Sequence, residues 1–193
     1  MPSLPADLAP LLLTPEDAER VDVHGRTDAA VLVPLFEREG DLLGVFTRRR
    51  DDLRRHAGEI SFPGGRRDPG ESLRETALRE AEEEIGLDPG GVTLAGALPP
   101  TPTVVTSYAV YPFVGVIEDG NRWRPSAGEV AEVLELPLRA LRDGHGRRRL
   151  VRRGVPFHTD VYVVGEDLIW GATARILGEL LARVGPVLER PAA

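Results

Sequence analysis

One segment constrains the fold more than any other: a glycine-rich turn followed by an amphipathic helix at residues 72–85. Ser72 and Glu75 have the spacing of a capping box, in which two side chains satisfy backbone N–H groups at a helix start. Apolar residues recur every three or four positions along the segment, and Gly86 follows as a helix-ending residue. Apolar, strand-forming segments lie before and after this helix, so we expect it to pack on a sheet.

The apolar patterning predicts strands on both sides of this central helix. We expect them at residues 29–36, 41–47, 60–62, 92–98, 107–117, 130–136, 149–151 and 155–164. The first two are expected to form a hairpin, and residues 63–65 to end the third strand. Short helices are predicted after Thr14 and at 137–142, and a last amphipathic helix at about 172–184. Elements in this order predict an α/β fold, with an α/β/α sandwich built on a mixed sheet.

The composition excludes several classes of function. The 193-residue chain suits one domain, and its net charge of −7 argues against a nucleic-acid binder. The chain has no cysteine and no lysine, which excludes thiolate metal sites and lysine Schiff bases and leaves arginine as the strong cation for phosphate. No apolar run is long enough to cross a membrane, and the N-terminus lacks the basic start of a secretory signal. We therefore expect a cytoplasmic protein.

Three acidic residues give the central helix its most distinctive chemistry. Glu80, Glu83 and Glu84 are spaced i, i+3 and i+4, so we expect these helix glutamates to share one face, opposite the apolar stripe. Carboxylates about 4 Å apart repel by roughly 4 kcal/mol per pair at an effective dielectric near 20, and Mg²⁺ or Mn²⁺ would relieve that repulsion. The alternative is a solvated acidic face, which the three acids alone would favour.

The spacing of the whole segment reverses that preference. It resembles the Nudix box, G-x5-E-x7-R-E-U-x-E-E-x-G-U, in which U is apolar. The residues at the fixed positions are Gly65, Glu71, Arg79, Glu80, Glu83, Glu84 and Gly86, with Ala81 and Leu87 at the apolar ones. So many matches make chance a poor explanation. The chain is therefore similar to Nudix hydrolases, and the resemblance implies a single Nudix-type domain over 1–193, with an N-terminal extension at 1–28 and a core at about 29–185.

The resemblance also implies a role for each matched residue. The helix glutamates look like the ligands of Mg²⁺ or Mn²⁺. Gly65 would let the backbone turn and would offer its carbonyl to the same ion. Glu71 and Arg79 look like a pair that fixes the loop against the helix, with Glu71 assisting at a metal or a water. The implied chemistry is metal-assisted attack of water on a pyrophosphate.

The residues just before the box point to a substrate. They look like the coenzyme A signature of Nudix enzymes, L-L-T-x-R-[S/A]-x3-R-x3-G-x3-F-P-G-G. The matching residues are Thr47, Arg49, Arg54, Gly58, Phe62, Pro63, Gly64 and Gly65. Arg50 replaces a small residue, which is the clearest departure and adds a cation that a phosphate could use. The resemblance implies hydrolysis of coenzyme A or a derivative to adenosine 3′,5′-bisphosphate and 4′-phosphopantetheine.

The signature supplies the candidate substrate-binding residues. Arg49 and Arg54 would grip phosphate in a bidentate manner, including the 3′-phosphate of coenzyme A. Phe62 would line the pocket, and Gly58 and Gly64 belong to the same binding segment. In the alternative interpretation, these arginines form surface ion pairs with neighbouring acids.

Other assignments remain open. Glu129 or Glu132 would supply a general base from a loop facing the metal, or both would be exposed strand acids. His56 lies inside the signature, although a lone loop histidine is more often a surface hydrogen-bonding residue. The competing functions are a Nudix hydrolase of another small nucleotide, such as ADP-ribose, NADH or a damaged nucleotide, and a non-catalytic nucleotide-binding module. The N-terminal segment and the apolar C-terminal helix hint at a homodimer.

Overall fold

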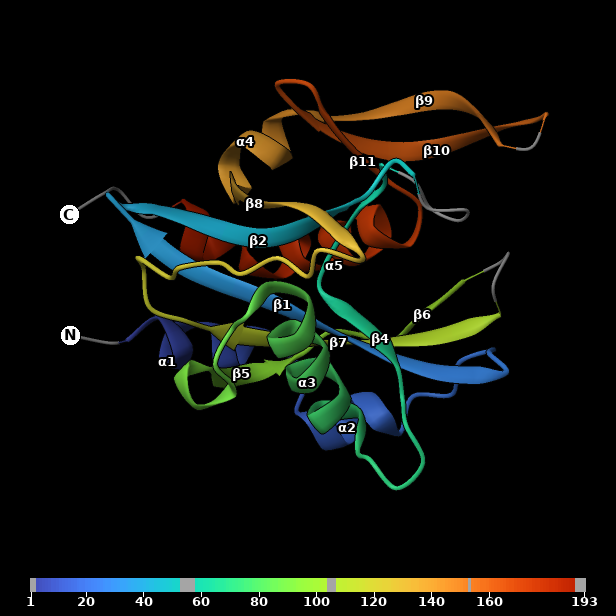
Figure 1. Cartoon of the computed structure of the whole chain (residues 1–193). Helices are drawn as coiled ribbons and strands as arrows, with labels where there is room; N and C mark the ends of the chain where they lie inside the picture. Colours follow the sequence, from blue (N-terminus) through green and yellow to red (C-terminus); the bar gives the residue numbers. More distant parts are fainter. Residues whose placement is uncertain (1–2, 53–57, 104–106, 153, 190–193) are drawn as a thin grey trace.

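The computed structural model describes residues 3–52, 58–103, 107–152 and 154–189 (Figure 1). Its helices are α1 (Leu4–Leu8), η1 (Ala9–Leu11), α2 (Pro15–Glu19), α3 (Leu73–Ile85), η2 (Pro89–Gly91), α4 (Leu138–Asp143) and α5 (Gly171–Leu188). Its strands are β1 (Thr27–Arg38), β2 (Asp41–Arg49), β3 (Ile60–Ser61), β4 (Gly64–Arg66), β5 (Thr93–Ala97), β6 (Thr101–Pro102), β7 (Tyr108–Val116), β8 (Val130–Pro137), β9 (His145–Arg152), β10 (Val155–Val164) and β11 (Asp167–Trp170).

The main sheet is mixed, as predicted, and β1 lies at its centre. Its strands follow the order β3-β2-β1-β7-β5, with β4 also pairing with β1, β6 with β7 and β8 with β2. The pairing of β1 with β7 is parallel, whereas β2 and β4 pair with β1 in the antiparallel sense. The predicted hairpin at 29–47 is confirmed as β1–β2. Residues 63–65 were expected only to end a strand, but Gly64 and Gly65 belong to β4 instead.

Two apolar layers cover the main sheet, one on each face. Along β1, Ala30, Leu32 and Phe36 face the layer that contains α3 and α2. Val33 and Leu35 face the opposite layer, which contains α1, α4 and α5. This alternation follows from the two-residue period of a strand. Figure 1 shows α3 in front of the sheet and α5 behind it, so the predicted α/β/α sandwich is confirmed.

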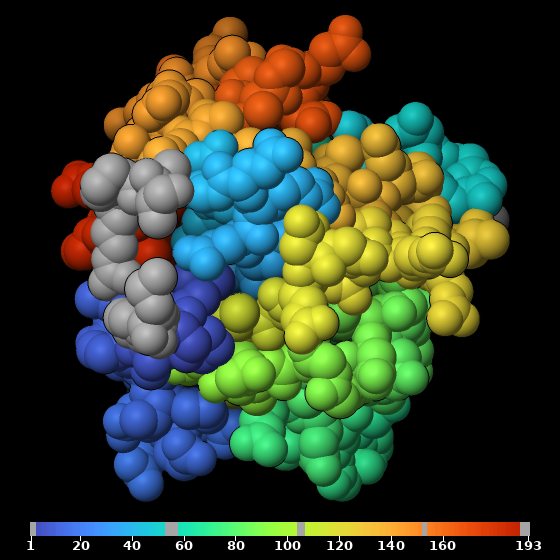
Figure 2. Space-filling view, turned by 90° about the vertical axis from the view of Figure 1, so that its left-hand side faces the viewer, coloured from blue at the N-terminus to red at the C-terminus, as the bar shows by residue number. Residues whose placement is uncertain are grey.

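A second sheet, which the sequence patterning did not separate from the first, contains β9, β10 and β11. Its strands are antiparallel and follow the order β11-β10-β9. The strands predicted from the sequence end at residue 164, so β11 (Asp167–Trp170) was not predicted. The hairpin of β9 and β10 projects at the top of the molecule (Figure 2).

The apolar residues of the two terminal segments pack within the same chain. Leu8 of α1 is fully buried, and Leu13 forms a bridge with Ala97 beside β5. The last helix, α5, turns its apolar side into the core formed with α1 and α4. The apolar residues of these two segments are thus buried inside one chain. They give no support to the predicted homodimer, which remains a prediction. No helix in the described part of the chain is long and apolar enough to span a membrane.

Candidate active site

The central helix begins and ends where its local sequence predicts. Ser72 is the N-cap of α3, and both reciprocal hydrogen bonds of a capping box with Glu75 are present. Gly86 is the C-cap in the left-handed conformation, with a φ of 71°, which favours glycine over other residues. These caps fix the length of α3 and therefore the positions of the helix glutamates, which all lie in its last two turns.

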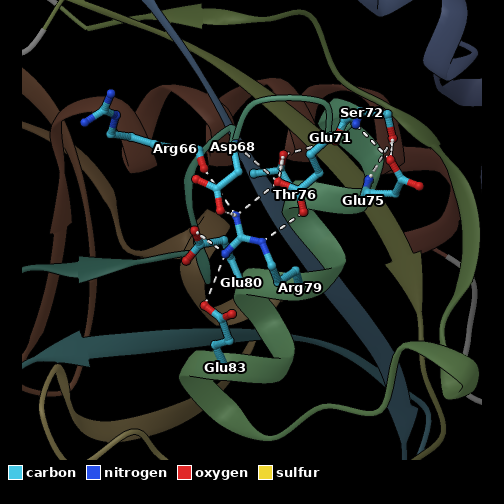
Figure 3. A network of polar contacts seen from close by, with 9 residues as sticks. All are labelled: Arg66, Asp68, Glu71, Ser72, Glu75, Thr76, Arg79, Glu80 and Glu83. Carbon is cyan, nitrogen blue, oxygen red and sulfur yellow. Dashed lines mark hydrogen bonds and ion pairs between the residues drawn. The ribbon is translucent and has the colours of Figure 1, made fainter.

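Arg79 lies at the centre of the polar network on α3 (Figure 3). Its Nε donates a hydrogen bond to Oε1 of Glu71 at 2.9 Å. Its Nη1 lies 2.9 Å from Oε1 of Glu80 and 3.1 Å from Oε2 of Glu83. Its Nη2 reaches the carbonyl of Arg66 at 3.3 Å. One guanidinium thus connects the loop after β4 with two of the helix glutamates.

Glu71 is held from three sides. In addition to Arg79, it accepts hydrogen bonds from the hydroxyl of Thr76 at 2.8 Å and from the backbone N–H of Asp68 at 3.3 Å. The hydrogen bonds from Arg79, followed by those from Thr76 and Asp68, lower the pKa of Glu71 to about 2. The carboxylate is therefore ionised at any physiological pH, as an anchor for Arg79 requires. This geometry agrees with the prediction that Glu71 and Arg79 pair and connect the loop with the helix. A role of the pair in catalysis remains a prediction.

Glu84 is the most buried of the helix glutamates, with 8% of its surface exposed. Its Oε2 accepts a hydrogen bond from the backbone N–H of Gly64 at 3.3 Å. Burial raises the pKa of Glu84 to about 7, and the nearby charges of Glu80 and Glu129 act in the same direction. The expectation that all three glutamates lie opposite the apolar stripe is therefore wrong for Glu84, because β4 covers the side of the helix on which it sits.

Gly65 and Glu80 face one another across the gap between β4 and α3. A Cβ atom on Gly65 would lie 2.4 Å from the carboxyl carbon of Glu80, so any larger residue would displace the carboxylate of Glu80. Gly65 is not among the residues with positive φ, so its requirement comes from close approach and not from the turn that the resemblance implied. Burial also raises the pKa of Glu80, and the charges of Glu83 and Glu129 contribute to this rise.

The donors on this face suit a hard divalent cation. Among the residues that the structure describes, no three acidic or histidine side chains lie close enough together to form a metal cage. The carboxylates of Glu80 and Glu84 are nevertheless oxygen donors in a partly buried site. Burial raises the pKa of both, and the negative charge of Glu80 raises the pKa of Glu84 further. Mg²⁺ and Mn²⁺ prefer oxygen ligands, and a cation would relieve this repulsion. The chemistry of the site therefore fits such an ion.

A turn between β7 and β8 closes the site on a second side. The backbone N–H of Ser126 donates to the carbonyl of Glu84 at 2.8 Å, and the N–H of Arg124 donates to the carbonyl of Ile85 at 2.9 Å. Glu129 follows in this turn, and its charge acts on both Glu80 and Glu84. Figure 2 shows the segment after β7 (yellow) running across the surface above the green segment that contains α3.

The two predicted general-base candidates have different surroundings. Glu132 lies on β8 and forms an ion pair with Arg48 at 3.2 Å. Arg48 also pairs with Asp167 of β11, which ties the main sheet to the second sheet. Glu129, in contrast, lies 3.5 Å from Nη1 of Arg49 and acts electrostatically on the helix glutamates. The arrangement therefore favours Glu129 over Glu132 as a group near the chemistry.

Arg49 is the predicted phosphate ligand that the structure brings to this site. Its side chain is 30% exposed, and among the described residues it forms a long ion pair, at 3.5 Å, with Glu129. Its Nε is buried and has no hydrogen-bond partner among the described residues. A buried donor without a partner costs about 1–3 kcal/mol, so the guanidinium has donor capacity left for a ligand. Among the described residues, the acidic partner found for Arg49 is Glu129 from the β7–β8 turn.

The other signature residues have structural roles. Gly58 has a φ of 67°, and a Cβ there would lie 2.7 Å from Oδ1 of Asp51. Phe62 is 3% exposed and stacks on Phe46 with ring centroids 4.5 Å apart, so its side chain belongs to the core and does not line an open pocket. Arg54 and His56 lie outside the described residues.

Two contributions to the site were not predicted. Thr76 is fully buried and orients Glu71, although its position in the box is not a fixed one. The backbone of Arg124 and Ser126 holds the β7–β8 turn against the end of α3. Backbone hydrogen bonds between distant segments depend on the fold, so the residue types offer no signal for them.

Comparison with known proteins agrees with this geometry. The family model of the NUDIX domain matches residues 26–154, which include β1, α3 and the whole of the site described above. The chain belongs to the Nudix family. The Nudix hydrolase NudL of Pectobacterium atrosepticum, named as uncharacterized, is 39% identical over 179 residues, covering 88% of this chain and 87% of the relative. Its namesake in Salmonella paratyphi B is 41% identical over 160 residues, covering 81% and 82%.

Solved structures share the fold of this Nudix chain. A MutT/nudix family protein from Enterococcus faecalis has a TM-score of 0.59 at 15% identity, covering 86% of this chain and 64% of that one. The NUDIX domain of Shewanella oneidensis NrtR, solved with ADP ribose, has a TM-score of 0.51 at 17% identity, covering 66% and 85%. At such identities the likeness shows the fold alone, which is the predicted Nudix-type α/β architecture.

Family membership fixes the function at a general level. The chain is a Nudix pyrophosphohydrolase that acts on a nucleoside diphosphate derivative. Nudix hydrolases generally use divalent metal ions such as Mg²⁺ or Mn²⁺. The names of the relatives do not specify coenzyme A.

Proposed function

We propose that this Nudix hydrolase cleaves the pyrophosphate of coenzyme A or a derivative to adenosine 3′,5′-bisphosphate and 4′-phosphopantetheine. The observation that carries the proposal is the placement of Arg49. Its guanidinium, which retains an unpartnered donor among the described residues, lies beside Glu129 and close to the helix glutamates. Arg49 also stands at a fixed position of the coenzyme A signature. A planar guanidinium matches the oxygens of a phosphate better than any other side chain.

The proposed metal ligands are Glu80, Glu83, Glu84 and the carbonyl of Gly65. When bound, Mg²⁺ or Mn²⁺ would neutralise the pyrophosphate oxygens and lower the pKa of a bound water. Glu83 has an exposed side chain and is held only by Arg79 among the described residues, so it can turn toward an ion at little cost. The pair of Glu71 and Arg79 would keep the loop after β4 and the helix in a fixed relation.

We assign the proton-accepting role to Glu129. Its carboxylate would take the proton from the attacking water at one of its Oε atoms. Two observations support this role: its turn is bound to α3 through the N–H of Ser126, and its charge acts on both Glu80 and Glu84. The contact at 3.5 Å between Arg49 and Glu129 is long, so the guanidinium can move to a phosphate without losing a strong bond. Glu84, held by the N–H of Gly64, would position the reacting end of the site.

A substrate panel tests this proposal. Hydrolysis of coenzyme A, 3′-dephospho-coenzyme A, ADP-ribose and NADH is compared with Mg²⁺ present, and the products are identified by chromatography and mass spectrometry. We expect the highest kcat/KM for coenzyme A, with the two products named above. A substrate preference for ADP-ribose or NADH would instead identify another Nudix specificity and refute the coenzyme A assignment.

The variant Arg49→Gln tests the residue that carries the proposal. It should reduce kcat/KM for coenzyme A by roughly tenfold or more, as expected for the loss of a charged hydrogen-bonding partner. The matched control is Arg142→Gln, because Arg142 is an exposed arginine with one acidic partner, on α4. If both variants kept wild-type kcat/KM for coenzyme A, Arg49 would not be a phosphate ligand.

A further inference from the structure

Arg50 differs from the coenzyme A signature, and the structure shows that its guanidinium is fully engaged. Its Nε and Nη2 bind Asp52 in a bidentate manner at 2.9 and 2.7 Å. Its Nη1 donates to the carbonyl of Ala127 at 2.6 Å. The expectation that Arg50 adds a cation for phosphate is therefore not supported, because all three nitrogens have protein partners.

The backbone of Arg50 holds the same turn as its side chain. Its N–H donates to the carbonyl of Glu129 at 3.1 Å, only two residues beyond Ala127. Within the turn, the carbonyl of Ser126 accepts from the N–H groups of Glu129 at 3.0 Å and Val130 at 2.9 Å. The end of β2 thus holds the turn at two points, one through the guanidinium and one through the backbone.

The opposite side of the turn rests on α3. The N–H of Ser126 donates to the carbonyl of Glu84 at 2.8 Å, so the turn connects the helix with the end of β2. The carboxylate of Glu129 lies 3.5 Å from Nη1 of Arg49, and its charge contributes to the raised pKa values of Glu80 and Glu84. A shift of the turn would therefore move Glu129 relative to both helix glutamates.

We propose that Arg50 is a positioning residue that fixes the Ser126–Glu129 turn and thereby places the carboxylate of Glu129 opposite the helix glutamates. The inference rests on the proposed function, in which Glu129 accepts the proton. A small residue at position 50 has no side-chain donor that reaches Ala127. The hydrogen bond to the carbonyl of Ala127 therefore depends on the arginine that this chain has there. The arginine fork is suited to the task, because Asp52 orients it by two parallel hydrogen bonds while Nη1 stays free to bind Ala127.

The effect should appear in turnover and not in global stability. The side chains of Arg50 and Asp52 are 42% and 64% exposed, and exposed ion pairs contribute little to folding. Misplacement of a catalytic group by about 1 Å, in contrast, can lower a rate by up to about a hundredfold. Arg50→Met, which keeps the length and removes the donors, should therefore fold normally and still turn over slowly.

The experiment is a double-mutant cycle with coenzyme A and Mg²⁺. Arg50→Met should lower kcat by about tenfold and change KM by less than about twofold, since binding is not its role. In a Glu129→Gln background the same substitution should have no further effect on kcat, because the group that it positions is no longer functional. Arg50→Lys should recover part of kcat, since an ammonium can still donate to Ala127. Arg142→Met, with a side chain 43% exposed, is the matched control and should not change kcat.

A second measurement needs neither substrate nor metal. Amide hydrogen exchange of residues 126–130 should be faster in Arg50→Met than in the wild type, with α3 unchanged. Equal losses of kcat in both backgrounds, or unchanged exchange in this turn, would overturn the positioning role. A wild type that does not hydrolyse coenzyme A would refute the proposed substrate and leave the exchange result to decide on Arg50. Full turnover of Glu129→Gln would overturn the role of Glu129, and the positioning proposal with it.

Discussion

The substitution Glu84→Gln should make the metal-free protein more stable at pH 8 while it abolishes turnover. Glu84 is 8% exposed, and burial raises its pKa to about 7 from the usual 4.5. A carboxylate held ionised against such a shift costs the folded state at most about 3 kcal/mol, at about 1.4 kcal/mol for each tenfold change in proton affinity. An uncharged amide of the same shape does not bear this cost, and its oxygen can still accept the hydrogen bond from Gly64.

The pH dependence gives the sign of the effect. The folded pKa lies above the unfolded one, so between pH 4.5 and 7 the folded protein retains a proton that the unfolded chain has lost. The contribution of Glu84 to stability is therefore present at low pH and is lost as the pH rises through this window. Glu84→Gln should be more stable than the wild type by roughly 1–3 kcal/mol at pH 8. The difference should disappear below about pH 4.5, where Glu84 is protonated in both the folded and the unfolded chain.

Thermal unfolding with a chelator present measures this difference. For a domain of this size 1 kcal/mol corresponds to about 2–4 °C in Tm, so we expect Tm of the variant to be higher by roughly 2–10 °C at pH 8. The matched control is Glu82→Gln, because Glu82 is an exposed residue of the same helix. Equal or lower stability of Glu84→Gln at pH 8, or the same gain at pH 5, would show that Glu84 is not a strained buried charge.

Three further predictions concern the same site. Glu71→Gln should lower the free energy of unfolding by about 1–2 kcal/mol in urea titrations at pH 7, because it weakens a partly buried pair with Arg79. Since the pKa of Glu71 lies near 2, below its usual 4.5, this difference should diminish as the pH falls from 4.5 toward 2, and a constant difference would contradict the pairing. Gly65→Ala should weaken Mn²⁺ binding in calorimetry by tenfold or more, since its Cβ would lie 2.4 Å from the carboxyl carbon of Glu80; unchanged affinity would remove Gly65 from the site. Exhaustive chelation should abolish hydrolysis and Mg²⁺ should restore it, so activity that survives chelation would refute metal dependence.

The local signals in the sequence predicted much of the framework. Ser72, Glu75 and Gly86 defined the ends of α3 correctly, because caps depend on residues within one turn of the helix. The β1–β2 hairpin followed from two apolar segments separated by a short polar stretch. These predictions required no knowledge of which distant segments meet.

The parts that were missed depend on contacts between distant segments. The second sheet is one example, since nothing in the patterning of 145–170 distinguishes a separate sheet from an extension of the first. The strand β4 is another, because a run of glycine and arginine carries no strand signal and pairs only where β1 offers it an edge. The hydrogen bond from Arg50 to the carbonyl of Ala127 is a third example, because it joins residues that are 77 positions apart.

The burial of Glu84 shows how a site can differ from the pattern that reveals it. Helical spacing placed three carboxylates together, but it considered only the polarity of α3 itself and so expected all of them to face away from the core. In the fold, β4 lies close over this side of the helix. There the N–H of Gly64 binds the carboxylate of Glu84, and Gly65 leaves room for the carboxylate of Glu80. The glycines of the box and its buried acids are thus parts of one feature. Without a cation it destabilises the fold by like charge and desolvation, and that repulsion is what a bound Mg²⁺ would remove.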